Sequence, residues 1–438
     1  MIQHIAILTN FTYEDPAFSL VHVVRNQITM IKKYGQITPV VVVADGFKPF
    51  ESSPFNGVTL KYISAVDVTN DADKVRDAKF DDDVARLYWG YKDALGEKIN
   101  EDWAIITHDM VYTPDNVKHQ VAARRLAYEY PNLKWFHWIH SATTPLIMSQ
   151  ERPYYREEYM KMIYEPFPNS KYVFFNNWSK RRIATNFMVP IDMVATVYHP
   201  TDIDDWFGLH ELSSKVVEAT DLLSADMSAI YPVRLDRGKQ PEVVLELMAR
   251  LSMRGLNTRC IIADFASSSK NQNDDKFQYR QSLHRMAEAI NYKHLYFTSE
   301  IDEQMSYNIP PRVIRELMML TNIFIIPSRS ESYSLITQEA VLTKNLVILN
   351  GDFPPFKEIF GDKNMTINVS SAVNSATGYD GETTPGYPQG RDKYFEDKAT
   401  EIIEKFNANS VLVTNAKIRQ ERNLKYVWEH YLAPLLNV

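Results

Sequence analysis

Two glutamates, Glu331 and Glu339, follow a short apolar run in the second half of the chain. The run, Ile323–Ile326, predicts a buried strand that ends at Pro327, and the next helix is expected to begin near Leu335. A strand–turn–helix unit presents its polar turn at the carboxyl edge of a parallel sheet, where open α/β folds bind ligands. Carboxylates there can accept hydrogen bonds from hydroxyl pairs, such as those of a sugar and a ribose. A sugar nucleotide is therefore the first ligand to consider.

A second candidate turn lies earlier in the chain, where Arg234 and Lys239 flank the passage from a predicted strand to a helix. That helix is expected to begin near Pro241, because proline is favoured in the first helical turn. A guanidinium and an ammonium near a helix amino terminus can bind a diphosphate. Alone, the pattern is also typical of a solvated basic turn. Glu331 could instead cap the helix that begins near Leu335, and Glu339 could be a solvated helix residue. The two turns together favour a diphosphate beside hydroxyl-binding carboxylates.

The bulk composition narrows the class of protein. A chain of 438 residues is too long for one ordinary core, so two domains are expected. The net charge of −7 is spread over both halves, which weakens a reading as a strongly nucleic-acid-binding or membrane-binding protein. Cys260 is the single cysteine, which excludes an intramolecular disulfide and a cysteine-rich metal site. Neither a signal-peptide pattern nor a membrane-spanning run is found, so we expect a cytoplasmic protein without integral membrane association.

Short apolar strands alternate with amphipathic helices through both halves, which predicts a parallel sheet covered on both faces in each. The strands are expected at 5–8, 39–43, 58–63, 104–107, 135–139, 172–175, 193–198, 229–233, 259–263, 295–297, 323–326, 346–349 and 365–368. The helices are expected at 19–34, 82–95, 116–130, 179–187, 241–254, 276–290, 311–320, 335–342 and 415–436. The fold class is therefore α/β, with two tandem doubly wound, Rossmann-like domains and a ligand in the cleft between them.

Domain boundaries follow from the same pattern. We expect a first domain over residues 1–205 and a second over 206–412. Residues 413–438 should form a C-terminal helix that packs on the first domain. Two polar segments, 267–275 and 370–392, are expected to be loops, and a loop as long as the second is usually functional or disordered.

The two turns also resemble a known family. Val233–Gln240 (VRLDRGKQ) and Pro327–Ala340 (PSRSESYSLITQEA) are similar to the motifs G-R-L-x3-K-G and P-S-x-x-E-G-F-G-x3-x-E-A of the retaining glycosyltransferases of family 4, which have the GT-B fold. Three further segments, at 138–141, 174–182 and 197–207, resemble other segments of the family more weakly. The resemblance follows the order of the whole chain and is specific between Pro232 and Glu358.

The resemblance implies a metal-independent, retaining hexosyltransferase that uses a nucleoside diphosphate sugar, a UDP-sugar first of all. The acceptor would bind to the first domain (1–205) and the donor to the second (206–412). Arg234 and Lys239 would hold the diphosphate and stabilise the leaving group. Glu331 would bind hydroxyls of the transferred sugar, and His140 would lie near the reacting sugar. The departing phosphate would take the acceptor's proton, so no protein nucleophile is required. The other implied donor contacts are Ser328, Glu339 and the backbone amides of Tyr333, Ser334 and Leu335.

Several departures from the family pattern leave the donor open. Gln240, Ser332 and Ser334 stand where the pattern has glycine, so a close backbone approach to phosphate is in question. The segment 344–346 replaces the family's G-x-P turn, and its amino-terminal glycine-rich loop is absent. His140 could equally be a hydrogen-bonded core histidine, and His108 occupies a similar strand end.

Other classes of function stay open at this point. Three D-x-D patterns, at 71–73, 81–83 and 202–204, would suit a metal-dependent transferase of another fold. A sugar-nucleotide or carbohydrate-binding protein without catalysis is a second alternative. The acceptor could be a glycan, a small molecule, a lipid, a protein or a modified DNA base. The basic run 180–182 is either a solvated helix face or an approach for an anionic acceptor, and the oligomeric state is open.

Overall fold

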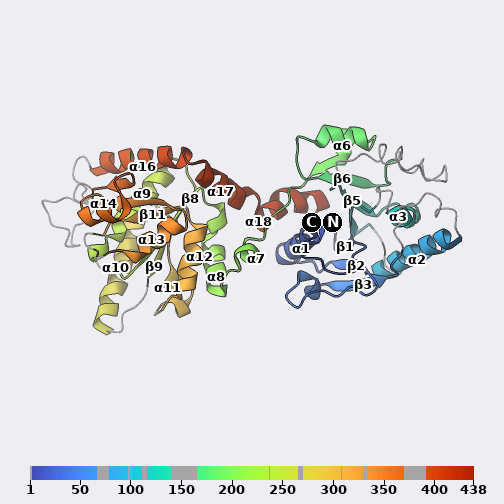
Figure 1. Cartoon of the computed structure of the whole chain (residues 1–438), viewed down its shortest axis with the longest axis horizontal. Coiled ribbons are helices and arrows are strands. Elements are labelled where there is room, and N and C mark those ends of the chain that lie inside the picture. The colour runs from blue at the N-terminus through green and yellow to red at the C-terminus, as the bar shows by residue number, and fades with distance from the viewer. Residues whose placement is uncertain are drawn as a thin grey trace. The chain divides into compact units, whose positions relative to one another are not determined.

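The computed structural model describes residues 2–66, 78–96, 99, 101–110, 116–140, 165–235, 237–264, 270–306, 308–328, 331, 333–368 and 391–438. The D-x-D pattern at 71–73, Ser332 and nearly all of the loop expected at 370–392 lie outside these ranges. The loop expected at 267–275 is wrong from Lys270 onward, where helix α10 (Lys270–Ala289) begins, because the polar run contains no glycine or proline to stop a helix. The chain folds into two compact units, Met1–Asp202 with Arg422–Val438, and Ile203–Glu421 (Figure 1). Residues 203–205 and 413–421 thus belong to the second unit.

The first unit is built on a sheet of seven strands, all of whose pairings are parallel. The strands are buried on both faces where the sequence is continuously apolar, as in Val41–Val43. Their spatial order is β3 (Thr59–Ile63), β2 (Val40–Ala44), β1 (His4–Leu8), β4 (Trp103–His108), β5 (Lys134–Trp138), β6 (Ser170–Phe174) and β7 (Val194–Thr196).

Helices cover both faces of this sheet. One face packs on α2 (Ala78–Leu95), α3 (Val117–Glu129) and α6 (Lys180–Asn186). The other packs on α1 (Ser19–Lys33) and on the C-terminal segment, through residues such as Trp428 and Leu432. Gly35 follows α1, and a Cβ there would lie 2.5 Å from the Trp428 ring, so glycine lets the C-terminal segment approach. The described residues of this unit also form the 3₁₀ turns η1 (Pro54–Gly57) and η4 (Ile191–Met193).

The C-terminal segment is not the single helix expected over 415–436. The chain leaves α17 (Ser410–Glu421) and begins again at α18 (Leu424–Val427), followed by a π-helical turn (Trp428–Leu432) and α19 (Ala433–Leu436). Asn423 causes the restart, because its side chain accepts a hydrogen bond from the Tyr426 amide and caps the new helix. Residues 422–438 therefore pack on the first unit while α17 belongs to the second.

The second unit contains a sheet of six strands, again with parallel pairings throughout. Their order is β10 (Leu295–Phe297), β9 (Thr258–Asp264), β8 (Met227–Val233), β11 (Ile323–Ile326), β12 (Leu346–Asn350) and β13 (Met365–Ile367). One face packs on α9 (Pro241–Met253), α10 (Lys270–Ala289), α16 (Arg391–Asn407) and α17. The other packs on α8 (Glu211–Thr220), α12 (Pro311–Leu320), α13 (Leu335–Leu342) and α14 (Pro354–Phe360). Shorter elements are α7 (Ile203–Phe207), α11 (Thr298–Ile301), η5 (Leu222–Ser224), η6 (Arg237–Lys239) and η7 (Glu303–Met305).

The strand orders confirm the predicted fold class of two tandem doubly wound domains. Counted within each unit, both sheets begin 3-2-1-4-5-6, and all thirteen expected strands are present. The order reverses between β1 and β4 in the first unit and between β8 and β11 in the second. Ligands of such sheets bind at the carboxyl ends of the strands on either side of this reversal. No helix among the described residues is long and apolar enough to cross a membrane.

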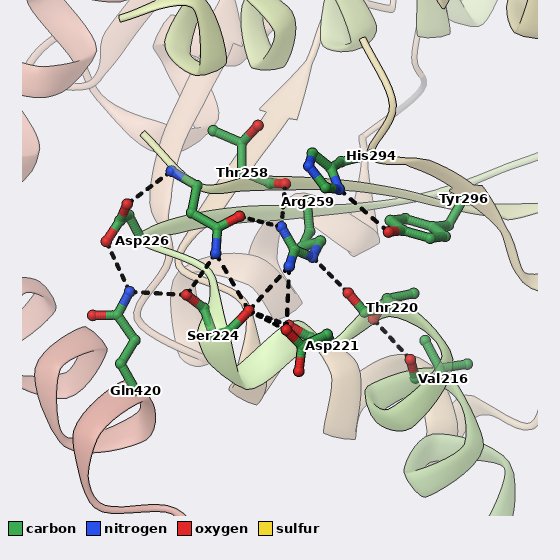
Figure 2. A network of polar contacts seen from close by, with 11 residues as sticks. Val216, Thr220, Asp221, Ser224, Asp226, Thr258, Arg259, His294, Tyr296 and Gln420 are labelled. Atoms are coloured by element: carbon green, nitrogen blue, oxygen red, sulfur yellow. Dashed lines mark hydrogen bonds and ion pairs between the residues drawn. The ribbon is translucent and has the colours of Figure 1, made fainter. Parts of the chain in front are cut away.

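A polar network holds the opposite, amino edge of the second sheet (Figure 2). The guanidinium of Arg259 donates to the carbonyl of Thr220 at 2.5 Å and to the hydroxyl of Ser224 at 3.0 Å. The side-chain amide of Gln420 donates to the Ser224 carbonyl and to the Asp226 carboxylate. The network therefore ties α8 and α17 to the starts of β8 and β9, and leaves the carboxyl edge for other roles.

Candidate functional site

The two predicted turns meet at the reversal point of the second sheet. Arg234 follows β8 directly, Lys239 ends the 3₁₀ turn before α9, and Glu331 follows the neighbouring strand β11. The Lys239 ammonium donates to a carboxylate oxygen of Glu331 at 2.6 Å, although 92 positions separate them. Arg234 is exposed and makes no ion pair with a described residue. One guanidinium and one ion pair therefore lie at the edge where a ligand of this fold binds.

The hydroxyl of Tyr231 also connects the two turns that carry this ion pair. The Tyr231 hydroxyl, on β8, donates to the Lys239 carbonyl at 2.8 Å and lies 3.3 Å from the hydroxyl of Ser328. The amide of Asn350, at the end of β12, donates to the Ser328 carbonyl at 2.9 Å. Neither Tyr231 nor Asn350 is among the site residues predicted from the sequence. A polar group near the carboxyl end of an otherwise apolar strand is the sequence feature that could have indicated them.

Three residues in the turns of the second unit have the left-handed backbone conformation that glycine favours. Gln240 has φ = 50°, Ser334 has φ = 70° and Lys344 has φ = 64°. A residue with a side chain costs about 1–2 kcal/mol there. Gln240 is fully buried, and the Ser334 hydroxyl lies 2.8 Å from that of Thr337, so packing and hydrogen bonding hold both turns. Gln240 and Ser334 are therefore left-handed although neither is glycine.

The remaining predicted donor contacts lie at the start of α13. Ser334 directly precedes this helix and is buried, whereas Tyr333 and Leu335 are 45% and 67% exposed. The Tyr333 hydroxyl accepts a hydrogen bond from Gln338 at 2.8 Å. Glu339 is exposed one turn into the helix. The structure thus places these residues in the turn after β11 or in the helix that follows it.

In the first unit, the histidines from the sequence analysis form a cluster at the carboxyl ends of the strands. His108 ends β4, His140 lies just after β5, and their Nδ1 and Nε2 atoms are 3.0 Å apart. The Nε2 atom of His108 lies 2.9 Å from the side-chain oxygen of Gln27. His140 stacks on His199 with ring centroids 5.4 Å apart and planes 2° apart. His108 is buried and His140 half-buried, so His140 is the more accessible of the pair.

Burial keeps the three imidazoles neutral. It lowers the pKa of His108 well below its usual value, and the nearby His140 and His199 add to this effect. Burial also lowers the pKa of His140, although the Asp109 carboxylate opposes the shift. The pKa of His199 falls to about 4, for burial first and for its proximity to His140 second. At neutral pH the cluster can therefore exchange hydrogen bonds with a ligand but supplies no positive charge.

One D-x-D pattern has a structural role. The Asp83 carboxylate is buried, accepts a hydrogen bond from Lys118 at 2.6 Å and pairs with Arg86, so it joins α2 to α3. In the part of the chain that the structure describes, no three histidine, cysteine, aspartate or glutamate side chains gather where they could hold a metal ion. Asp83 is therefore engaged in packing the first unit.

Comparisons with known proteins find similarity in structure only. No family model matches the chain, and no curated protein matches it. Anabaena HepE in complex with UDP and glucose is 12% identical, with 99% of each chain covered and a TM-score of 0.34. Sucrose-phosphate synthase of Thermosynechococcus elongatus is 13% identical, with 99% of this chain and 96% of that chain covered and a TM-score of 0.32. The N-terminal domain of Candida albicans trehalose-6-phosphate phosphatase is 11% identical, with 100% and 97% covered and a TM-score of 0.38. TM-scores this low do not support an argument from these structures. The fold class is therefore based on the observed strand orders, and the candidate site on the residues described above.

Proposed function

We propose that this protein is a retaining glycosyltransferase that moves a sugar from a nucleoside diphosphate sugar to an acceptor hydroxyl. The observation that carries the proposal is the Lys239–Glu331 ion pair at the reversal point of the second sheet, beside the exposed Arg234. Cations for a diphosphate and a carboxylate for sugar hydroxyls lie next to each other there. This is the juxtaposition that a nucleoside diphosphate sugar requires.

The ion pair is suited to exchange with such a donor. Lysine has three donor hydrogens, so Lys239 can bind a phosphate oxygen while it still contacts Glu331. The second oxygen of the Glu331 carboxylate can accept hydrogen bonds from the sugar. Arg234 can bind the diphosphate through two parallel hydrogen bonds. Together the two cations would neutralise the negative charge that grows on the leaving diphosphate, which makes metal independence part of the proposal.

The transfer needs no protein nucleophile in this proposal. The bond between the anomeric carbon and the diphosphate oxygen breaks while the acceptor oxygen bonds to the same face of that carbon. The departing diphosphate takes the acceptor's proton. His140, as a neutral imidazole, would hydrogen-bond to a hydroxyl of the transferred sugar, because burial lowers its pKa.

Binding and turnover of the donor test the proposal. Ligands that bind the folded state raise the apparent melting temperature, so a thermal-shift panel of nucleoside diphosphates and their sugars identifies the base, with UDP-glucose the first to try. Release of UDP from the donor then measures turnover, with and without a chelator. Binding without release from any donor would favour the alternative of a non-catalytic sugar-nucleotide-binding protein. Loss of activity in the chelator would contradict metal independence.

A further inference from the structure

One face of α6 and of the turn before it exposes an indole and two guanidiniums. Trp178 is 88% exposed, and Arg181 and Arg182 are exposed as well. Their spacing of three and four residues places all three on one side of a helical segment. The opposite side buries Ile183 and Ala184 in the core of the first unit. Packing of the helix therefore fixes which side faces solvent.

A hydrogen-bonded turn fixes the backbone that carries the indole. The Ser179 amide donates to the side-chain oxygen of Asn176 at 2.8 Å, and the Ile183 amide donates to the Ser179 carbonyl at 2.9 Å. Ser179 itself is buried. The exposed indole of Trp178 is therefore carried by a fixed turn and is accessible to a planar ligand.

The local charge is opposite in sign to that of the whole chain. Residues 170–200 contain four cations, Lys171, Lys180, Arg181 and Arg182, and a single acid, Asp192, whereas the chain has a net charge of −7. Neither Arg181 nor Arg182 forms an ion pair with an acid of the described residues. Arg181 and Arg182 are therefore available to pair with an anion.

This face adjoins the histidine cluster. Phe175, which leads from β6 into the Trp178 turn, stacks on His199 with ring centroids 5.0 Å apart. His199 stacks in turn on His140. The turn that carries Trp178 therefore begins three positions earlier, at Phe175, beside the histidine cluster at the carboxyl edge of the first sheet.

We propose that this face binds a nucleic acid, with a base on Trp178 and phosphates on Arg181 and Arg182. Nucleic acid offers a planar π system and regularly spaced phosphates together, and stacking platforms beside cations recognise it. A bilayer fits less well, because an interfacial helix needs an exposed apolar face, and the exposed residues of α6 itself are Arg181, Arg182 and Thr185. The exposed Met188 and Ile191 follow the helix and do not form a face of it. That the nucleic acid carries the acceptor hydroxyl rests on the function proposed above.

A nucleic-acid hydroxyl can act as the acceptor in the transfer proposed above. A hydroxyl oxygen of the nucleic acid bonds to the anomeric carbon as the bond from that carbon to the diphosphate breaks. The hydroxyl proton leaves with the nucleoside diphosphate. The acceptor is therefore a nucleic acid with an accessible hydroxyl on a base or a sugar.

Fluorescence anisotropy tests the surface. The probes are a labelled single-stranded DNA of about 20 nucleotides, longer than the roughly 4–16 nucleotides that common binding modules cover, and the duplex of the same sequence. Trp178→Ala should weaken binding by about 5- to 100-fold, because one stacked base is lost. Arg181→Ala with Arg182→Ala should weaken it and lower the slope of log K against log salt by about 1.4 for a single strand or about 1.8 for a duplex.

The matched control is Lys32→Ala with Lys33→Ala, which removes the same charge from exposed positions of α1 in the same unit. Its binding should equal that of the unaltered protein. Equal losses in this control, or no binding of either probe at about 50 mM salt, would overturn the proposal. Binding to phosphatidylserine vesicles instead of DNA, lost in the same α6 variants, would overturn it in favour of a lipid.

Donor chemistry separates this inference from the proposed function. Lys239→Ala should retain DNA binding while losing donor hydrolysis, and Trp178→Ala should retain the hydrolysis measured without acceptor. A protein that binds DNA through α6 but releases no diphosphate from any donor would refute the transferase and leave the nucleic-acid surface standing. A protein that hydrolyses its donor but binds no DNA would refute only the surface.

Discussion

Lys239 and Glu331 form an ion pair of 2.6 Å between the two turns that flank the reversal point of the second sheet. Their side chains are 23% and 18% exposed, so the pair is partly buried but still reachable from solvent. A ligand that reaches it can exchange hydrogen bonds with both groups. The variants below test that role.

Lys239→Ala and Glu331→Ala should each lower turnover by about 100-fold or more, because each removes a charge from the site of the leaving diphosphate or the sugar. The melting temperature should change little. Steady-state release of nucleoside diphosphate and a thermal melt provide the two measurements. Lys215→Ala is the control, because it breaks an ion pair of 3.0 Å with Asp302 in the same unit. Near-normal turnover in both site variants would refute the site.

Tyr231→Phe should lower the stability of the second unit by about 1 kcal/mol, because the Lys239 carbonyl loses its hydrogen bond. It should also raise KM for the donor, since the two turns lose their common anchor. Tyr292→Phe is the matched control, because it removes a buried hydroxyl 3.0 Å from that of Thr258 at the opposite sheet edge. The control should lose similar stability with KM unchanged. Equal KM values for the two variants would show that Tyr231 is merely structural.

His140→Ala should lower turnover, and His108→Phe should lower it by a smaller factor, because His108 only orients His140 through their 3.0 Å contact. Phenylalanine keeps a ring of similar size in the buried position but offers no hydrogen bond. The control is His119→Phe, since His119 is buried between α3 and α2, where its partner is the Tyr91 hydroxyl. Donor hydrolysis measures each variant. Unchanged turnover for His140→Ala would remove this cluster from the reaction.

The first unit should lose stability as the pH falls below about 6.5. Burial lowers the pKa of His137 to about 3, and those of His119 and His199 to about 4, so the unfolded chain binds protons that the folded chain does not. Each imidazole removes up to about 1.4 kcal/mol per pH unit between the unfolded and folded values, and none above 6.5. Urea unfolding at pH 7, 6 and 5 measures the slope.

His137→Phe should reduce that slope. His137 lies among Trp135, Phe167 and Tyr172, and no described residue partners its Nε2 atom, so a phenyl ring suits the position. The Thr107 hydroxyl would lose its partner, at a cost of about 1 kcal/mol at pH 7. An unchanged slope would show that His137 does not titrate with unfolding.

Lys344→Gly should stabilise the protein by about 0.5–1 kcal/mol, because Lys344 is exposed and has φ = 64° just after α13. Lys363→Gly is the control, since Lys363 is also an exposed lysine but is not among the residues with positive φ. It should gain nothing and lose a few tenths of a kcal/mol. Equilibrium unfolding of both variants checks the difference.

Local sequence determined most of the elements and both candidate turns. Apolar runs bounded by proline, glycine and polar residues specify the central strands, because burial on both faces demands a continuous apolar run. The edge strand β3 is mostly not buried. The residue types of Arg234, Lys239 and Glu331 indicate phosphate and hydroxyl chemistry without any knowledge of the fold. The C-terminal helix was predicted wrongly as continuous, because one capping side chain, Asn423, outweighs the helical periodicity around it.

Only the tertiary structure decided which of these residues meet. Lys239 reaches Glu331 because β8 and β11 are neighbours, and that neighbourhood depends on a strand order that no local pattern encodes. The Tyr231 bridge and the stack of His140 on His199 arise in the same way. The exposure of Trp178 is likewise a property of the packed unit, since the side of α6 that buries Ile183 determines what remains outside. The sequence thus specified the chemical groups, and packing specified their partners.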